Sequence, residues 1–358
     1  MSSGGPTSQT SRKPPVLKRR RRGRTARADL ASIFWSESRL ANDASIVPSG
    51  PNDATVRAGG RDVGLTNLNK IFFPKLGLTK GDLLRYYLRV APALLPHVRG
   101  KAMVMKRYPN GATGDFFFMK RAPSPRPEWI KTCAIEHGSG NVINFPIIDD
   151  EAALLWVINL GCIDLNPWYA PCADYNHPDY LHIDLDPFDA PFEAVREAAL
   201  VVRDVFASLG MTPYVKTTGS KGMHVYVAIK RGPTQHGVWA VAKALSHAIA
   251  KAHDDLLIVE YRVAKRPRGR VLLDYNQNSF GRTLASIYSV RPNEEAMVST
   301  PLEWKEVEAG CAPADFTMAN VPERIERVGD LWARLEQKPG RFDVIALARK
   351  LGVNDVEV

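Results

Sequence analysis

The sequence predicts an α+β fold with mixed sheets, and two observations support this prediction. Segments with helical apolar spacing and short apolar runs typical of strands follow one another without strict alternation, which argues against a purely parallel α/β sheet. Apolar residues make up 45% of the 358 residues and charged residues 24%, a composition typical of globular proteins. At this length we expect one large domain or two small ones.

Individual elements follow from periodicity and capping signals. Thr79 can cap a helix whose apolar face carries Leu83, Leu84 and Tyr87. Helices are also predicted over residues 149–160, 189–209 and 235–253, and within a helix-rich stretch over 322–351. Strands are predicted over residues 103–107, 116–119, 181–185, 213–217, 223–229 and 271–275.

Charge divides the chain into unequal parts. Nine lysines and arginines, and no acidic residue, occur among residues 1–28, so this segment contributes +9 of the net charge of +10. We predict that residues 1–60 form a basic, disordered extension, residues 61–345 the folded domain and residues 346–358 a tail. The basic run is either a solvated tail or an arm that binds polyanions.

Composition also argues against several classes of protein. No apolar run approaches the roughly 18 residues of a membrane span, so we expect no membrane contact. The four cysteines are too few and too scattered for a disulfide framework or a zinc site: Cys133, Cys162, Cys172 and Cys311. A reducing compartment, the cytoplasm, is therefore the simpler interpretation.

Clustered carboxylates are the first chemical signal. Asp184 and Asp186 lie two residues apart on a predicted strand and therefore point to the same face. Because adjacent carboxylates repel, a divalent cation such as Mg²⁺ or Mn²⁺ would stabilise the pair; the alternative is a strand end whose acids face water. Asp274 ends another apolar strand and could complete a three-carboxylate site. Taken alone, Asp274 is better interpreted as the cap of the loop that follows it.

A glycine-containing loop between two predicted strands is the second signal. Gly219 and Gly222 would let backbone N–H groups approach an anion. Side chains of the same segment add further donors: Ser220, Lys221 and His224. Arg291, downstream, could bind phosphate oxygens bidentately. The segment is not a P-loop, and an ordinary polar hairpin is the alternative.

An aromatic run precedes two cationic residues. Phe116, Phe117 and Phe118 lie just before Lys120 and Arg121. A strand would by default bury one or two of these rings in the core. The alternative is a platform on which nucleic-acid bases stack.

Together these blocks strongly resemble the polymerase domain of bacterial ligase D, which belongs to the archaeo-eukaryotic primase superfamily. They occur in this order: Leu-Thr-Asn-Leu-Asn-Lys, Phe-Phe-x-Lys, Asn-Pro-Trp, Asp-Leu-Asp-Pro, Gly-Ser-Lys-Gly-x-His, Leu-Asp-Tyr-x-Gln-Asn and Tyr-Ser-x-Arg. The resemblance covers about residues 60–345, and free-standing mycobacterial-type primase-polymerases are the most similar kind. It implies a primase-type core of mixed sheets flanked by helices, with the active-site cleft between the sheets.

The resemblance also implies a role for individual residues. Those expected to hold two Mn²⁺ or Mg²⁺ ions and to be catalytic are Asp184, Asp186 and Asp274. Those expected to bind an NTP or dNTP are Ser220, Lys221, Gly222, His224, Arg291 and Asn166. Those expected to bind the 5′-phosphate of a downstream strand are Asn67, Lys70 and Lys80. Those expected to stack on template bases are Phe117 and Phe118.

The implied activity is template-directed nucleotidyl transfer that fills short gaps in bacterial DNA repair, with ribonucleotides preferred. The expected partners are gapped DNA, nucleoside triphosphates, and either a separate ATP-dependent DNA ligase or the Ku end-binding protein, and we expect a monomer. Two positions depart from the family pattern. Thr218 replaces the usual Ser, and Asn166 replaces a frequent His. An Asn side chain cannot carry charge, which leaves nucleotide preference and sugar contacts open.

Two other functions compete with this interpretation. A metal-dependent nuclease or phosphatase would also use clustered aspartates but would need no nucleoside triphosphate. A non-catalytic nucleic-acid-binding module would use the basic extension with Phe117 and Phe118, and would tolerate the loss of Asp274.

Overall fold

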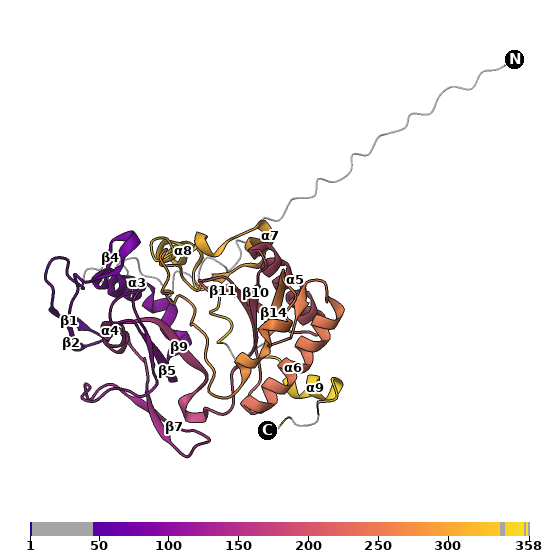
Figure 1. Ribbon diagram of the computed structural model, residues 1–358, viewed down its shortest axis with the longest axis horizontal. Coiled ribbons are helices and arrows are strands. Elements are labelled where there is room, and N and C mark those ends of the chain that lie inside the picture. The colour runs from indigo at the N-terminus through magenta and orange to yellow at the C-terminus, as the bar shows by residue number, and fades with distance from the viewer. Residues whose placement is uncertain (2–45, 337–340, 354–355, 357–358) are drawn as a thin grey trace. The chain divides into compact units, whose positions relative to one another are not determined.

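The computed structural model describes residues 1, 46–336, 341–353 and 356. Contacts divide the chain into Met1–Glu37 and Ser38–Val358, and every element named below belongs to the second unit (Figure 1). Most of the predicted basic extension, residues 2–45, lies outside the described residues, as do four residues of the predicted tail.

A mixed sheet of six strands, counted in the described part of the chain, forms one half of the core. Its order is β13 (Leu257–Ile258), β14 (Arg270–Asp274), β10 (Tyr180–Phe188), β12 (Met223–Ala228), β11 (Pro213–Thr217) and β15 (Pro301–Leu302). Only β13 and β14 pair in parallel among the named strands of this sheet. Helices α5 (Phe192–Ser208) and α6 (Gln235–Ala252) pack on it (Figure 1). All six residues of β12 are buried, as expected for a central strand covered on both faces.

A smaller antiparallel sheet, again within the described residues, forms the other half. Its order is β6 (Phe117–Met119), β5 (Lys101–Arg107) and β9 (Cys162–Pro171). Helices α3 (Lys80–Val98) and α4 (Glu151–Asn159) pack against each other, and α4 also contacts β9. The start of α3 is the predicted one: Thr79 Oγ1 accepts a hydrogen bond from Asp82 N, and Asp82 Oδ2 accepts one from Thr79 N. This reciprocal pair satisfies two backbone donors of the first turn.

Shorter elements complete the fold. Three strand pairs lie outside the two sheets: β1 (Ala54–Ala58) with β2 (Arg61–Leu65), β3 (Ile71–Phe73) with β4 (Leu78–Thr79), and β7 (Thr132–Glu136) with β8 (Val142–Pro146). The C-terminal part carries α7 (Trp304–Ala309), α8 (Val321–Val328) and α9 (Val344–Lys350).

The structure confirms the α+β class and corrects the two predicted domain limits. Strand β1 lies within the range predicted as disordered, and it buries Val56 and Ala58 against β2 and α4. Helix α9 crosses the limit at residues 345/346 and buries Leu347 and Ala348, next to α6. Both segments are short and weakly patterned, so their burial depends on partners distant in sequence.

A disulfide, which the cysteine count did not predict, joins Cys133 on β7 to Cys172 after β9. The two cysteines are 39 positions apart in the sequence, but the fold brings their Cα atoms to 5.7 Å. They belong to or pack against an apolar cluster that includes Phe145 and Trp168. In the described part of the chain, no helix is both long and apolar enough to cross a bilayer.

A buried ionic cluster ties α3 to the segment after α8. His97 Nε2 lies 2.6 Å from Asp330 Oδ2, and His97 Nδ1 lies 3.3 Å from Glu336 Oε1. Burial by itself lowers the pKa of His97, but hydrogen bonds with these two carboxylates raise it to about 9. Burial raises the pKa of Glu336, yet the charges of Lys101 and His97 and the hydrogen bond with His97 lower it to about 2. His97 is therefore an imidazolium that holds two carboxylates at neutral pH.

This cluster predicts a loss of stability in mild alkali. The pKa of His97 is about 9 in the folded protein and about 6.5 in an unfolded chain. Its contribution is therefore complete below pH 6.5 and is lost as the pH rises through 9. We expect the Tm measured by circular dichroism to fall over this window. His97→Gln should remove most of that fall, whereas His247→Gln, at an exposed position on α6, should keep it. Equal slopes in the two variants would contradict the assignment.

Candidate active site

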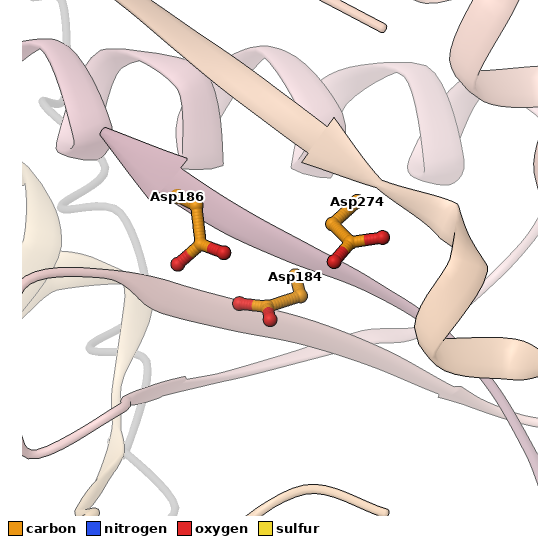
Figure 2. Close-up of side chains that lie close together, drawn as sticks. All are labelled: Asp184, Asp186 and Asp274. Atoms are coloured by element: carbon orange, nitrogen blue, oxygen red, sulfur yellow. The ribbon is translucent and has the colours of Figure 1, made fainter. Parts of the chain in front are cut away.

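Three aspartates converge on one face of the six-stranded sheet. Asp184 and Asp186 project from β10 and Asp274 from the end of β14, with their carboxylates turned toward one another (Figure 2). Asp184 lies opposite both Asp274 and His224 in the strand register. One carboxylate oxygen from each aspartate lies within 4.8 Å of the other two. The predicted alternation along β10 is therefore confirmed. The pairing of β10 with β14 brings the third carboxylate, Asp274, beside this pair.

The electrostatics of this cluster fit a divalent cation. Burial and then the charge of Asp274 raise the pKa of Asp184 to about 7. The charge of Asp184, followed by burial and by Asp274, raises the pKa of Asp186 to about 7. Carboxylate oxygens are the ligands that Mg²⁺ and Mn²⁺ prefer, and a dication would relieve this repulsion. The donor set present thus fits such an ion.

Two residues that sequence analysis missed hold Asp274. Tyr261 OH donates to Asp274 Oδ1 at 2.8 Å, and Gln277 Nε2 donates to Oδ2 at 2.8 Å. Asn276 N also donates to Oδ1, so Asp274 caps the short helix η4 (Tyr275–Asn278), as its alternative interpretation expects. The two roles are compatible because a carboxylate offers about four lone-pair positions.

The loop between β11 and β12 is held beside this cluster by Thr218 and two glycines. Thr218 Oγ1 accepts hydrogen bonds from the backbone N–H groups of Ser220 and Gly222. Gly219 has a φ of +66°, and a Cβ at Gly222 would lie 2.4 Å from the carbonyl oxygen of Leu185. Both positions therefore require glycine. Arg291 Nη1 donates to Thr218 O at 3.1 Å and so holds the loop.

These groups line a cleft of about 480 Å³ between the two sheets, which is where the resemblance places the active site. Its lining contains every predicted nucleotide-binding residue: Asn166, Ser220, Lys221, Gly222, His224 and Arg291. Asp184, Asp186 and Phe118 line it as well. The charged lining residues that sequence analysis missed are Lys106, Asp164 and Arg266. Lys106 and Asp164 become neighbours only when β5 pairs with β9, so no local signal could reveal them.

A second cavity, of about 300 Å³, lies beside the start of α3. Its lining contains the three residues predicted to bind a 5′-phosphate, Asn67, Lys70 and Lys80. It also contains Arg107, which sequence analysis missed. Lys80 Nζ donates to Thr66 O, and Lys70 Nζ donates to Pro109 O and Asn110 Oδ1. Burial, and then the charge of Lys70, lowers the pKa of Lys80 to about 8. A cavity that buries Lys80 close to a second cation is electrostatically suited to an anion.

The hairpin of β5 and β6 separates the two cavities. Phe118 pairs with Lys106, and both line the cleft between the sheets. Phe117 pairs with Arg107, which lines the second cavity and holds its guanidinium 5.2 Å from the Phe117 ring centre. Phe116, Phe117 and Phe118 are all exposed, so the core interpretation of this run is wrong. Phe117 and Phe118 were expected to act together, but they lie toward different cavities.

A carboxylate triad on antiparallel strands, a glycine loop with cationic groups and a cleft between two sheets are the features that the resemblance to primase-polymerases implies. Residues 79–332 match the family model of the LigD primase-polymerase domain, so this chain belongs to that family. The resemblance drawn from the sequence blocks is thereby confirmed.

Named relatives agree with this assignment. The multifunctional non-homologous end joining protein LigD of Mycolicibacterium smegmatis is 30% identical over 292 residues, which cover 81% of this chain and 38% of that protein. The bifunctional LigD of Bacillus subtilis is 30% identical over 266 residues, 74% of this chain and 42% of that protein. The chain thus spans about two fifths of the length of these relatives. The solved polymerase domain from Mycobacterium tuberculosis ligase D, in complex with DNA, has a TM-score of 0.71 and 30% identity. That match covers 76% of this chain and 98% of that one.

The carboxylate cluster predicts stabilisation by Mn²⁺. At 100 times its Kd, an ion that binds only the folded state should add about 2.7 kcal/mol to the free energy of unfolding. Asp184→Asn should abolish most of the Mn²⁺-dependent rise in Tm, and should raise the Tm without metal because it relieves the repulsion. The matched control is Asp254→Asn, at an exposed position after α6. A Mn²⁺ response in Asp184→Asn as large as that of the control would refute this site.

Proposed function

We propose that this protein is a DNA-dependent primase-polymerase that extends primers and fills short gaps bearing a 5′-phosphate in DNA repair, with ribonucleotides preferred. The observation that carries the proposal is the pair of cavities on either side of the β5–β6 hairpin. One combines carboxylates with a cationic loop, and the other gathers Lys70, Lys80 and Arg107. A gap presents two matching features, a primer 3′ end and a downstream 5′-phosphate. The solved relative bound to DNA supports DNA as the partner.

The proposed metal-binding and catalytic residues are Asp184, Asp186 and Asp274. Two divalent ions, Mn²⁺ or Mg²⁺, would supply Lewis acidity toward the primer 3′-hydroxyl and charge neutralisation for the triphosphate. His224 Nε2 lies 3.0 Å from Asp184 Oδ1. Tyr261 and Gln277 donate hydrogen bonds to Asp274 and orient its carboxylate. These hydrogen bonds keep Asp274 in place beside the two aspartates of β10 before substrate binds.

The glycine loop is the proposed triphosphate site. The residues assigned to it are Ser220, Lys221, Gly222, His224 and Arg291. Thr218 keeps the loop backbone folded, so the cations need little reorganisation when charge develops on the leaving pyrophosphate. Asn166, at the opposite wall of the same cleft, is assigned to the nucleotide as well. Phe118 is placed to stack on a base in this cleft, whereas Phe117 lies toward the phosphate cavity.

The second cavity is the proposed 5′-phosphate site, formed by Asn67, Lys70 and Lys80 with Arg107. A bound phosphate would offset the repulsion that lowers the pKa of Lys80. Filling a gap leaves a nick, so a separate ATP-dependent DNA ligase is the proposed downstream partner. The Ku end-binding protein is the alternative partner, since the relatives are named for end joining. We propose that the protein acts as a monomer.

Primer extension tests the polymerase assignment. On a gapped duplex with Mn²⁺ and NTPs, the wild-type protein should add nucleotides to the primer. Asp184→Ala and Asp186→Ala should each lower the rate roughly 100- to 1000-fold, the scale of losing a transition-state electrostatic contact, while DNA binding stays near wild type. Asp254→Ala should extend normally. Extension retained by the Asp184→Ala and Asp186→Ala variants would contradict the metal assignment. Shortening of the primer without NTPs would indicate a nuclease.

The phosphate cavity generates a separate prediction. Lys70→Met removes the charge that faces this cavity but keeps the aliphatic stem. We expect it to lower the preference for a 5′-phosphorylated gap over a 5′-hydroxyl gap at least tenfold, because a charge-assisted hydrogen bond contributes roughly 1.5–3 kcal/mol. The matched control is Lys251→Met, at the exposed end of α6. An unchanged preference in Lys70→Met would remove this residue from the phosphate site.

A further inference from the structure

Asp164 is a buried carboxylate that the proposed polymerase mechanism does not use. Its side chain is 2% exposed, yet it lines the cleft between the sheets. In the described part of the chain its side-chain partners are distant. Asn166 Nδ2 lies 3.5 Å from Asp164 Oδ1, and Arg291 Nε lies 3.6 Å from Asp164 Oδ2. Buried carboxylates normally accept close hydrogen bonds, whereas the side-chain hydrogen bond that Asp164 accepts from Asn166 is long.

Arg291 also lacks a close hydrogen-bond partner at one of its nitrogens. Its Nε is buried and has no hydrogen-bond acceptor among the described residues, while its Nη1 is taken by Thr218 O. Burial raises the pKa of Asp164 and outweighs the opposing charges of Arg291 and Lys106. The structure therefore has an under-bonded acid and an under-bonded cation side by side at the cleft wall. A small neutral donor could complete the bonding of the acid.

The strand register locates this acid between two proposed contacts of the nucleotide. Phe118 pairs with Lys106 across β6 and β5, and Lys106 pairs with Asp164 across β5 and β9. Phe118 and Asp164 are thus two strand spacings apart, about 10 Å, on the face that lines the cleft. Arg291 lies next to Asp164 and donates a hydrogen bond to the glycine loop. A nucleotide with its base on Phe118 and its phosphates at the loop would have its sugar over Lys106, Asp164 and Asn166.

We propose that Asp164, assisted by Asn166, binds a sugar hydroxyl of the incoming nucleotide and determines which sugar is accepted. This inference rests on the proposed polymerase function and adds a specificity residue to it. A ribose hydroxyl donates to the Asp164 carboxylate, and Asn166 Nδ2 donates to the hydroxyl oxygen. A sugar that lacks this hydroxyl leaves the buried acid without its donor, which disfavours binding.

Single-nucleotide insertion into a one-nucleotide gap opposite dT tests the inference. The substrates are ATP, 2′-deoxy-ATP and 3′-deoxy-ATP, each with Mn²⁺. We expect wild type to prefer ATP at least tenfold, in kcat/KM, over one of the two analogues. Asp164→Ala should lower that ratio at least tenfold, mainly through KM for ATP, and Asp164→Asn should lower it at least threefold. If Asp164→Ala loses the preference for ATP over 2′-deoxy-ATP, Asp164 binds the 2′-hydroxyl. If it loses the preference for ATP over 3′-deoxy-ATP, Asp164 binds the 3′-hydroxyl.

Controls separate this inference from the function on which it rests. Asp254→Ala should leave all ratios unchanged, and the near-isosteric Asp164→Asn decides the outcome if Asp164→Ala does not fold. An equal loss for all three nucleotides would mean that Asp164 only supports Arg291, and would overturn the inference. Extension by wild type with no preference for either hydroxyl would overturn it too, while leaving the polymerase assignment intact. Absence of extension by wild type would instead refute the polymerase function.

Discussion

The mutual repulsion of three carboxylates is the constraint around which this site is built. Asp184, Asp186 and Asp274 are held with carboxylate oxygens within 4.8 Å of one another, although the pKa values of Asp184 and Asp186 show the electrostatic cost. Strand register enforces the arrangement. A slip of β14 by one residue would turn Asp274 to the opposite face of the sheet. The buried apolar residues of β10, β12 and β14 therefore position charges that would otherwise separate.

The second sheet gives this carboxylate site its surroundings. Lys106 and Arg107 are adjacent on β5 but line different cavities, and the register of β5 against β9 shifts between these two residues. On β6, Phe118 pairs with Lys106 and Phe117 pairs with Arg107. One hairpin thus sets the separation of the nucleotide cleft from the phosphate cavity. The presence of two cavities on one hairpin fits the proposed filling of gaps that bear a 5′-phosphate.

Charges in this protein serve two different purposes, and the sign of the neighbouring charge distinguishes them. In the ionic cluster that ties α3 to the C-terminal part of the fold, the cations His97 and Lys101 balance the carboxylates of Asp330 and Glu336. In the two cavities like charges lie beside one another: acids repel acids at Asp184, and the lysines Lys70 and Lys80 repel each other. Uncompensated charge costs stability, and a ligand of opposite charge restores it.

The sequence by itself determined the α+β class, the capped start of α3 and the strands that carry the three aspartates, because these depend on periodicity and on signals within a few residues. Its motif blocks also pointed to the family before any contact was known. Tertiary structure decided the rest. Asp164 and Lys106 meet only through the pairing of β5 with β9, and Cys133 reaches Cys172 only through the fold. Phe117 and Phe118, neighbours in the sequence, lie toward different cavities because successive side chains of a strand alternate. Contacts between segments far apart in the chain leave no periodic or local trace, so only the folded structure reveals them.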